Sequence, residues 1–116
     1  MIVREGQLRK ILGIGLETSC RGAGISLRDA LERSDYARLR SEFRPSDLLP
    51  LIRGNRELVE QWIRYSEDKR TSGGWYLIES ACTIGRVGGE DPLPFASIEL
   101  AVAEYVVQEL DFWSAK

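Results

Sequence analysis

The stretch that most constrains the fold runs from Glu57 to Glu79, where a helical pattern gives way to a glycine pair and then to an aromatic segment. The helical pattern comes from four apolar residues on one face, Leu58, Val59, Trp62 and Ile63. We expect this helix to end between residues 66 and 69. Gly73 and Gly74 then permit the positive φ values of a tight turn. The chain should therefore reverse at this point and enter a strand over residues 75–79.

The residues after this strand predict a hairpin and a closing helix. Residues 82–87 are rich in β-branched side chains and form a second strand candidate, separated from the first by Ser80 and Ala81. Pro92 and Pro94 mark residues 88–94 as a loop. Ser97 can cap a final helix of about 15 residues, a typical length for a core-facing helix. Its apolar stripe is Ile98, Ala101, Val102, Tyr105, Val106, Leu110 and Trp113.

The first residues of the chain predict a short helix and a loop. Leu8, Ile11 and Leu12 share one helical face, which Gly13 and Gly15 interrupt. Residues 17–24 should form a loop. Residues 1–3 offer a possible third strand, which matters because a two-stranded hairpin is marginal alone and needs helices over one face.

Short helices should fill the next part of the chain. Ser26, with Asp29 three residues later, can cap a helix that reaches Arg33. Ser34 can cap a second helix that buries its aromatic face and is closed by Pro45. A third helical segment should begin at residues 46 and 47, with Pro50 tolerated in its first turn. The apolar residues of these segments are Leu27, Ala30, Leu31, Tyr36, Leu39, Phe43, Leu48, Leu49, Leu51 and Ile52.

These elements predict an α+β fold in which several helices pack on a small antiparallel hairpin or sheet. The chain has 116 residues, of which 43% are hydrophobic and 29% charged, as in ordinary globular proteins. We therefore expect residues 1–116 to form a single domain with one core.

The composition excludes several kinds of catalytic, metal-binding and membrane-spanning protein. The chain has no histidine, which excludes Ser-His-Asp and Cys-His catalysis. Cys20 and Cys82 lack CxxC spacing and have no histidine to help bind zinc, so we expect buried, reduced thiols and no metal site. No apolar run approaches the roughly 18 residues that a bilayer requires, and residues 1–10 lack the apolar core of a secretory signal. These features predict a cytoplasmic protein that does not bind membranes.

Charge is unevenly distributed. Residues 1–70 hold 14 Lys and Arg against 11 Asp and Glu, a net of +3, whereas residues 71–116 hold 2 against 7, a net of −5. An acidic surface can attract a basic protein by long-range steering. It argues against a nucleic-acid-binding protein, which would carry a basic patch.

The densest polar cluster lies at residues 65–72 and allows three interpretations. It can be a solvated helix end, or a partner-binding surface, because Tyr, Trp and Arg dominate protein interfaces. It can also be the active site of a small metal-dependent hydrolase or nuclease. That site would use Glu67, Asp68 and Lys69, or Glu57, Glu60 and Asp68 around Mg²⁺. Adjacent helical residues point in different directions, which disfavours the third interpretation.

Residues 62–77, W-I-R-Y-S-E-D-K-R-T-S-G-G-W-Y-L, and the acidic helical segment 96–113 resemble the bacterial immunity proteins of contact-dependent growth inhibition. The likeness is strongest over residues 55–113 and slight over residues 1–45. It implies a non-catalytic cytoplasmic protein without a cofactor, a monomer or weak homodimer. Such a protein binds a cognate toxin domain, often a nuclease, and blocks its active site or substrate surface. A non-catalytic adaptor subunit is the remaining alternative. The candidate partner-binding residues are Glu57, Tyr65, Glu67, Asp68, Lys69, Arg70, Tyr76, Glu104, Glu109 and Asp111.

Overall fold

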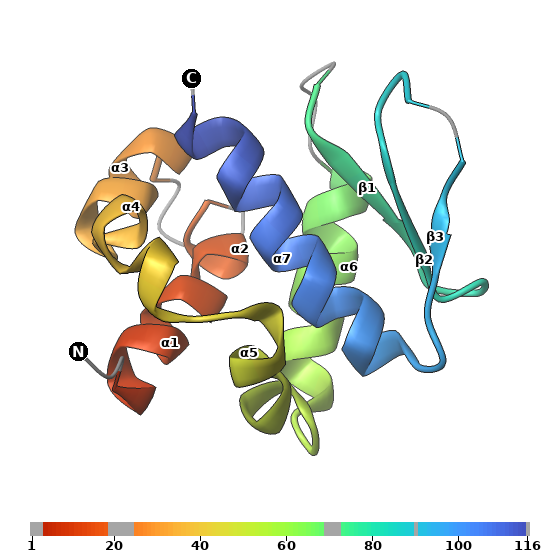
Figure 1. Ribbon diagram of the computed structural model, residues 1–116, viewed down its shortest axis with the longest axis horizontal. Helices are drawn as coiled ribbons and strands as arrows, with labels where there is room; N and C mark the ends of the chain where they lie inside the picture. The colour runs from red at the N-terminus through yellow and green to blue at the C-terminus, as the bar shows by residue number, and fades with distance from the viewer. Residues whose placement is uncertain (1–3, 19–24, 69–72, 90, 116) are drawn as a thin grey trace.

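Helix α7 (Ile98–Ser114) runs through the middle of the computed structural model, with helices on one side and a three-stranded sheet on the other (Figure 1). The structure describes residues 4–18, 25–68, 73–89 and 91–115. Helices packed on an antiparallel sheet confirm the predicted α+β fold. The predicted N-cap of α7 is confirmed as well, since the Ser97 hydroxyl accepts a hydrogen bond from the amide of Leu100 (3.3 Å).

Helix α7 is buried over much more of its surface than one stripe. Its predicted stripe is largely buried, but Ala103, Val107 and Glu109 are buried as well. The reason is its central position, because α5 (Pro45–Ile52) packs on one side of it and strand β1 (Trp75–Ile78) on another. A helix with neighbours on several sides needs apolar residues all around.

The sheet has the order β1-β2-β3 and is antiparallel throughout. Strand β2 (Thr83–Arg86) pairs with β1 in the predicted hairpin, with Trp75 opposite Arg86. The third strand is β3 (Leu93–Pro94), within the segment predicted as a loop. Residues 1–3, the predicted source of a third strand, lie outside the described residues. Pro94 is compatible with this strand because β3 lies at the edge of the sheet.

Helix α6 (Arg56–Asp68) matches the predicted helix and is anchored by Trp62. The Trp62 side chain is fully buried, and its indole N–H donates to the carbonyl oxygen of Leu12 (2.9 Å). That carbonyl belongs to the last residue of α1 (Glu5–Leu12), which α2 (Ile14–Glu17) follows after Gly13. Gly15 is buried against Trp62, where an added Cβ would stand 3.1 Å from the indole. The second glycine therefore serves close packing and does not interrupt the helical segment.

The short helices show one confirmed cap and three corrections. The Ser26 hydroxyl accepts from the amide of Asp29 and caps α3 (Leu27–Arg33), as predicted. Ser34 does not cap the next helix. It ends α3 by donating to the carbonyl of Leu31, and Asp35 (φ 59°) turns the chain into α4 (Tyr36–Leu39).

A short 3₁₀ turn, η1 (Arg40–Glu42), follows α4. Pro45 opens α5 at its first position instead of closing the helix before it, and Pro50 lies in the interior of α5 instead of its first turn. Both differences arise because α5 starts at Pro45, where a missing N–H costs nothing. Tyr36, Leu39 and Phe43 are buried, as their spacing predicted.

Candidate functional site: the outer face of the sheet

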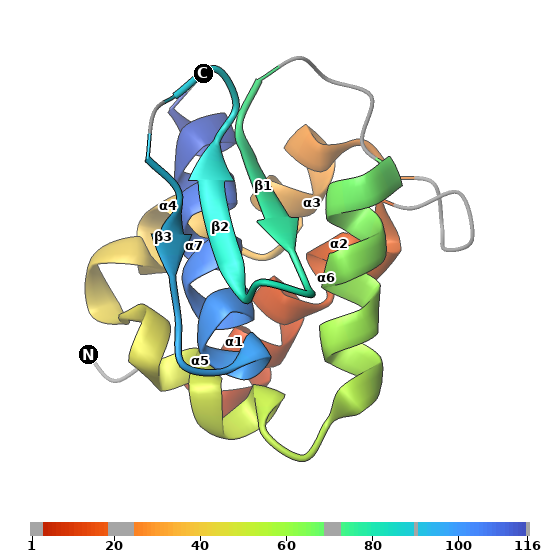
Figure 2. The same ribbon diagram turned by 90° about the vertical axis from the view of Figure 1, so that its right-hand side faces the viewer.

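The sheet has one face packed on the helices and one face that no described element covers (Figure 2). Leu77 and Ile84 are direct partners on the inner face, and both are buried. Because side chains alternate along a strand, Tyr76, Ile78 and Val87 lie on the opposite face. Ile78 is 43% exposed and Val87, directly after β2, is 39% exposed. We call the uncovered side, with Tyr76, Ile78, Thr83, Gly85 and Val87, the outer face.

A tyrosine ring forms the centre of the outer face. Tyr76 is the direct cross-strand partner of Gly85, and a Cβ added to Gly85 would overlap the Tyr76 ring. Glycine at this position therefore lets the ring lie down across β2, where any larger residue would push it away. The result is an aromatic surface, half-buried and flanked by the exposed aliphatic side chains of Ile78 and Val87.

Carboxylates border the outer face on the side of α6. Arg56, at the start of α6, pairs with Glu60 (3.4 Å) and with Glu79, the first residue of the turn after β1. The hydrogen bond with Glu79 is the main reason that the pKa of Arg56 is raised. Glu67 lies seven residues after Glu60, on the same side of α6. Arg64 lies between Glu60 and Glu67 on the same exposed side of the helix, so this border carries three carboxylates and two guanidinium groups, an excess of one negative charge.

The free edge of β1 is closed by side chains. The hydroxyl of Ser66 on α6 accepts from the amide of Leu77 (2.8 Å). The amide of Trp75 donates to Glu109 (2.7 Å), and Tyr105 donates to the carbonyl of Trp75 (3.1 Å). On the other side of the sheet, β3 has only two residues, and one is proline. Because its edges are blunted in these ways, the sheet offers a partner its outer face in preference to an edge.

The predicted partner-binding residues of the charged corner do not converge. Glu57, Glu67 and Asp68 are exposed on α6, and Lys69 and Arg70 lie outside the described residues. With a rise of 1.5 Å per residue, Glu57 and Asp68 are about 16 Å apart along the helix axis. The Mg²⁺ ligand set of Glu57, Glu60 and Asp68 is therefore contradicted. Among the described residues, no group of three or more His, Cys, Asp or Glu could hold a metal ion.

Glu109 was predicted as a partner-binding residue on the surface, but it lies in the core. Its side chain is fully buried, and it accepts hydrogen bonds from the hydroxyl of Tyr65 (2.7 Å), the amide of Trp75 and the indole of Trp113 (3.1 Å). Burial, with the carboxylate of Glu109 beside it, raises the pKa of Tyr65 above its ordinary range. Tyr65 and Glu109 thus belong to the core, where they join α6, β1 and α7, and a partner cannot reach the Glu109 carboxylate.

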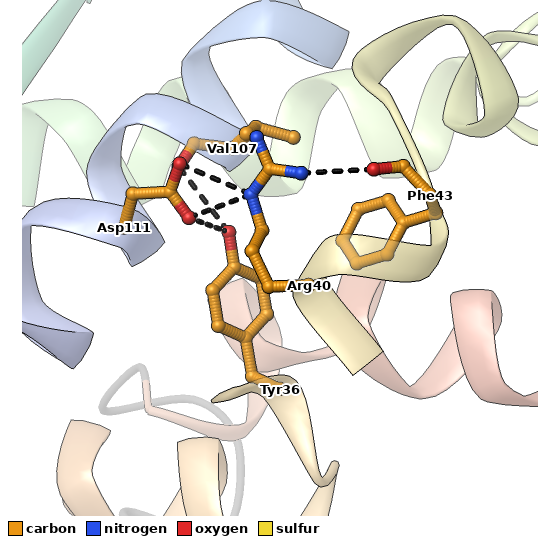
Figure 3. Close-up of polar contacts among 5 residues, drawn as sticks. All are labelled: Tyr36, Arg40, Phe43, Val107 and Asp111. Carbon is orange, nitrogen blue, oxygen red and sulfur yellow. Dashed lines mark hydrogen bonds and ion pairs between the residues drawn. The ribbon is translucent and has the colours of Figure 1, made fainter. Parts of the chain in front are cut away.

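Asp111 is partly exposed but is held by its neighbours (Figure 3). The guanidinium of Arg40 donates to both carboxylate oxygens (2.8 and 3.1 Å), and the Tyr36 hydroxyl donates to one of them (2.7 Å). Arg40 also donates to the carbonyl of Phe43 (2.8 Å). Asp111 therefore ties η1 and α4 to α7. Of the predicted residues on α7, Glu104 is half-buried, and Tyr76 of β1 lies on the outer face.

A groove that the sequence did not indicate lies between α3, α4 and the end of α7, with a volume of about 650 Å³. Leu27, Leu31 and Trp113 form its apolar part. Two ion pairs lie along it, Arg28 with Glu32 (3.9 Å) and Arg38 with Asp35 (3.0 Å). Their charges balance, so the groove favours neither a cationic nor an anionic ligand. Trp113, predicted as a core residue, is only half-buried here.

Comparison with family models, curated proteins and solved structures gives no match. In the described part of the chain, no helix has the length and hydropathy needed to cross a membrane. Cys82, expected to be buried, is half-exposed in the turn before β2 at a φ of 47°, and Cys20 lies outside the described residues.

Proposed function

We propose that this protein is an immunity protein that binds a cognate toxin domain, such as a nuclease, in the cytoplasm and blocks its active site or substrate surface. The uncovered outer face of the sheet is the observation that carries this proposal. Four large hydrophobic side chains among the described residues are exposed, and two of them, Ile78 and Val87, lie together on the outer face, whereas Leu93, opposite Ile84, belongs to the inner face at the edge of the sheet. Apolar side chains gathered in this way are typical of protein interaction sites.

The charge distribution supports a basic partner. Residues 71–116 carry a net charge of −5. Glu109 is buried and Asp111 is paired with Arg40, so the exposed carboxylates in the described part of this segment are Glu79, at the border of the outer face, and Asp91. Glu60 and Glu67 on α6 add negative charge to the same border. An interface of this kind pairs a central apolar contact with polar groups around it.

Toxin inhibition tests the proposal directly. The toxin domain encoded beside this gene is purified, and its activity is measured with and without a stoichiometric amount of this protein. We expect inhibition and a complex that survives size-exclusion chromatography, with light scattering giving the stoichiometry. Full toxin activity at an excess of this protein would reject the proposed function. An obligate homo-oligomer that does not bind the toxin would favour the adaptor alternative.

A matched pair of variants connects inhibition with the sheet. Ile78→Ser removes an apolar side chain that is 43% exposed on the outer face, and Leu16→Ser removes one that is 42% exposed on α2. We expect the first variant to weaken toxin binding about tenfold or more, as is typical of an interface anchor. The second should leave binding unchanged. Equal effects of the two variants would show that toxin binding does not depend on the outer face of the sheet.

A further inference from the structure

We propose that the partner docks across the outer face of the sheet and places an arginine side chain on the ring of Tyr76, with its charge near the carboxylates that border α6. This inference rests on the proposed function for the identity of the partner. The chemistry of the contact comes from the outer face itself, which combines an aromatic ring, exposed aliphatic side chains and an excess of negative charge.

The aromatic part of the argument concerns Tyr76 and Gly85. Because Gly85 has no side chain, the half-buried Tyr76 ring can lie across it, on the face of the sheet that no described element covers (Figure 2). The face of an aromatic ring attracts a cation, and a planar guanidinium can stack on it. Arginine is also less strongly hydrated than lysine, so its charged group loses less hydration free energy when it moves next to Ile78 and Val87.

The charge of the border favours a cation. Arg56 is shared by Glu60 and Glu79, and with Glu67 and the exposed Arg64 counted as well, three carboxylates face two guanidinium groups, which leaves an excess of negative charge there. Glu67 is the chain neighbour of Ser66, whose hydroxyl binds the amide of Leu77, the neighbour of Tyr76. Glu67 and Tyr76 therefore lie at the same level of the junction between α6 and β1.

The nearest base on the sheet does not oppose this attraction. Arg86 is opposite Trp75 in the register and therefore belongs to the inner face, where its guanidinium lies over the ring of Phe112 (5.4 Å to the centroid). Arg86 also shows that an aromatic ring and an arginine already associate in this way within the molecule. With Arg86 directed away, the outer face is complementary to a basic partner and not to an acidic one.

The test uses synthetic peptides and does not require the toxin. A peptide of alternating arginine and leucine is titrated into the isotopically labelled protein, and amide chemical shifts are followed by NMR. We expect the shifts to cluster at residues 76–78 and 83–87. The lysine and leucine version should bind several-fold more weakly, and a glutamate and leucine version should not bind. Tyr76→Ala should weaken the arginine peptide about fivefold, as expected for one exposed cation–π contact.

A pair of charge reversals provides the control. Glu67→Lys replaces a glutamate at the border of the outer face, and Glu32→Lys replaces one beside the groove. Both glutamates are exposed on helices. The first should weaken the arginine peptide and the second should not. The inference is overturned if the shifts map to the groove between α3, α4 and α7. It is also overturned if Tyr76→Ala binds unchanged, or if the lysine peptide binds as tightly as the arginine peptide.

The two proposals can fail separately. Peptide binding at the outer face without toxin inhibition would reject the immunity function and leave the docking chemistry in place. Toxin inhibition that survives Tyr76→Ala and Glu67→Lys would keep the immunity function and reject this docking surface.

Discussion

The carboxylate of Glu109 links three elements from within the core. It accepts from Tyr65 on α6, Trp75 on β1 and Trp113 on its own helix α7, and it is fully buried. A buried carboxylate is tolerated only when donors surround it, because removal of its hydration is costly. Glu109 therefore fixes how the sheet meets α6 and α7.

Replacement of this carboxylate by an amide should destabilise the protein. Glu109→Gln keeps the size of the side chain but points an NH₂ group at donors that need an acceptor. We expect a loss of about 2 kcal/mol in the free energy of unfolding, typical of a buried donor left without a partner. Urea unfolding followed by tryptophan fluorescence should show a lower midpoint with an unchanged m-value.

The matched control is Glu104→Gln on the same helix. Glu104 is half-buried and lies outside this network, so its replacement should change stability by less than about 0.5 kcal/mol. A Glu109→Gln midpoint equal to that of the control would show that the network does not stabilise the fold.

Strand β1 depends on α6 for its edge. The hydroxyl of Ser66 occupies the hydrogen-bonding position that another strand would otherwise fill at Leu77. Ser66→Ala should therefore cost about 1 kcal/mol and speed hydrogen exchange at the Leu77 amide. Ser80→Ala, in the exposed hairpin turn, serves as the control and should change neither quantity. Unchanged exchange at Leu77 in the Ser66 variant would contradict this assignment.

Helix α5 contains an unfavourable residue. Pro50 lies inside the helix, where it cannot donate to the carbonyl four residues earlier. Pro50→Ala restores the missing donor, and we expect a gain of about 1 kcal/mol, reduced from the full helix-interior penalty by the greater freedom of the unfolded chain. Pro45→Ala at the first position of α5 should give no gain. The stability of both variants is measured by thermal unfolding. An equal gain in both would contradict the explanation that Pro50 destabilises α5 by lacking a hydrogen-bond donor.

The whole molecule should lose stability in alkaline solution because two tyrosines are buried in its core and a third is partly buried against it. Burial, above all, raises the pKa of Tyr36, Tyr65 and Tyr105 beyond the ordinary tyrosine range. The folded protein keeps these protons when the unfolded chain begins to release them, near pH 10. The folded state is then the one that binds more protons, so stability falls as pH rises above about 10.

For three such groups the free energy of unfolding should be about 4 kcal/mol lower at pH 11 than at pH 9. Urea unfolding across this range measures the change. Tyr36→Phe removes one of the groups and should reduce the fall by about a third. A variant that shows the same pH dependence as the wild type would contradict the contribution of Tyr36.

Local patterns along the chain were sufficient for much of the fold. The stripe around Trp62 identified α6, the β-branched residues on either side of Ser80 and Ala81 identified the hairpin, and the caps at Ser26 and Ser97 were correct. Ser34 and Pro45 were assigned to the wrong helices. Each can begin or end a helix, and its role depends on the backbone angle of its neighbours, which the sequence does not specify.

The candidate site was less accessible to sequence reasoning. Acidic residues of α7 were expected on the surface, but Glu109 is in the core and Asp111 binds Arg40, 71 residues away in the chain. Side chains alternate along a strand, so Trp75 and Tyr76 lie on opposite faces of the sheet, but the sequence does not indicate which face the helices cover. No local pattern in the sequence indicates the role of Gly85, because that role depends on the Tyr76 ring in the neighbouring strand.

The sequence alone determined the fold class, most helices and the hairpin, because these depend on spacing and on caps a few residues away. It also excluded histidine-based catalysis. Only the tertiary structure decided that β3 supplies the third strand of the sheet, that Glu109 is buried, and that Tyr76 lies on the face of β1 opposite the buried Leu77. These outcomes depend on contacts between residues distant in the chain, whose energies no local pattern records.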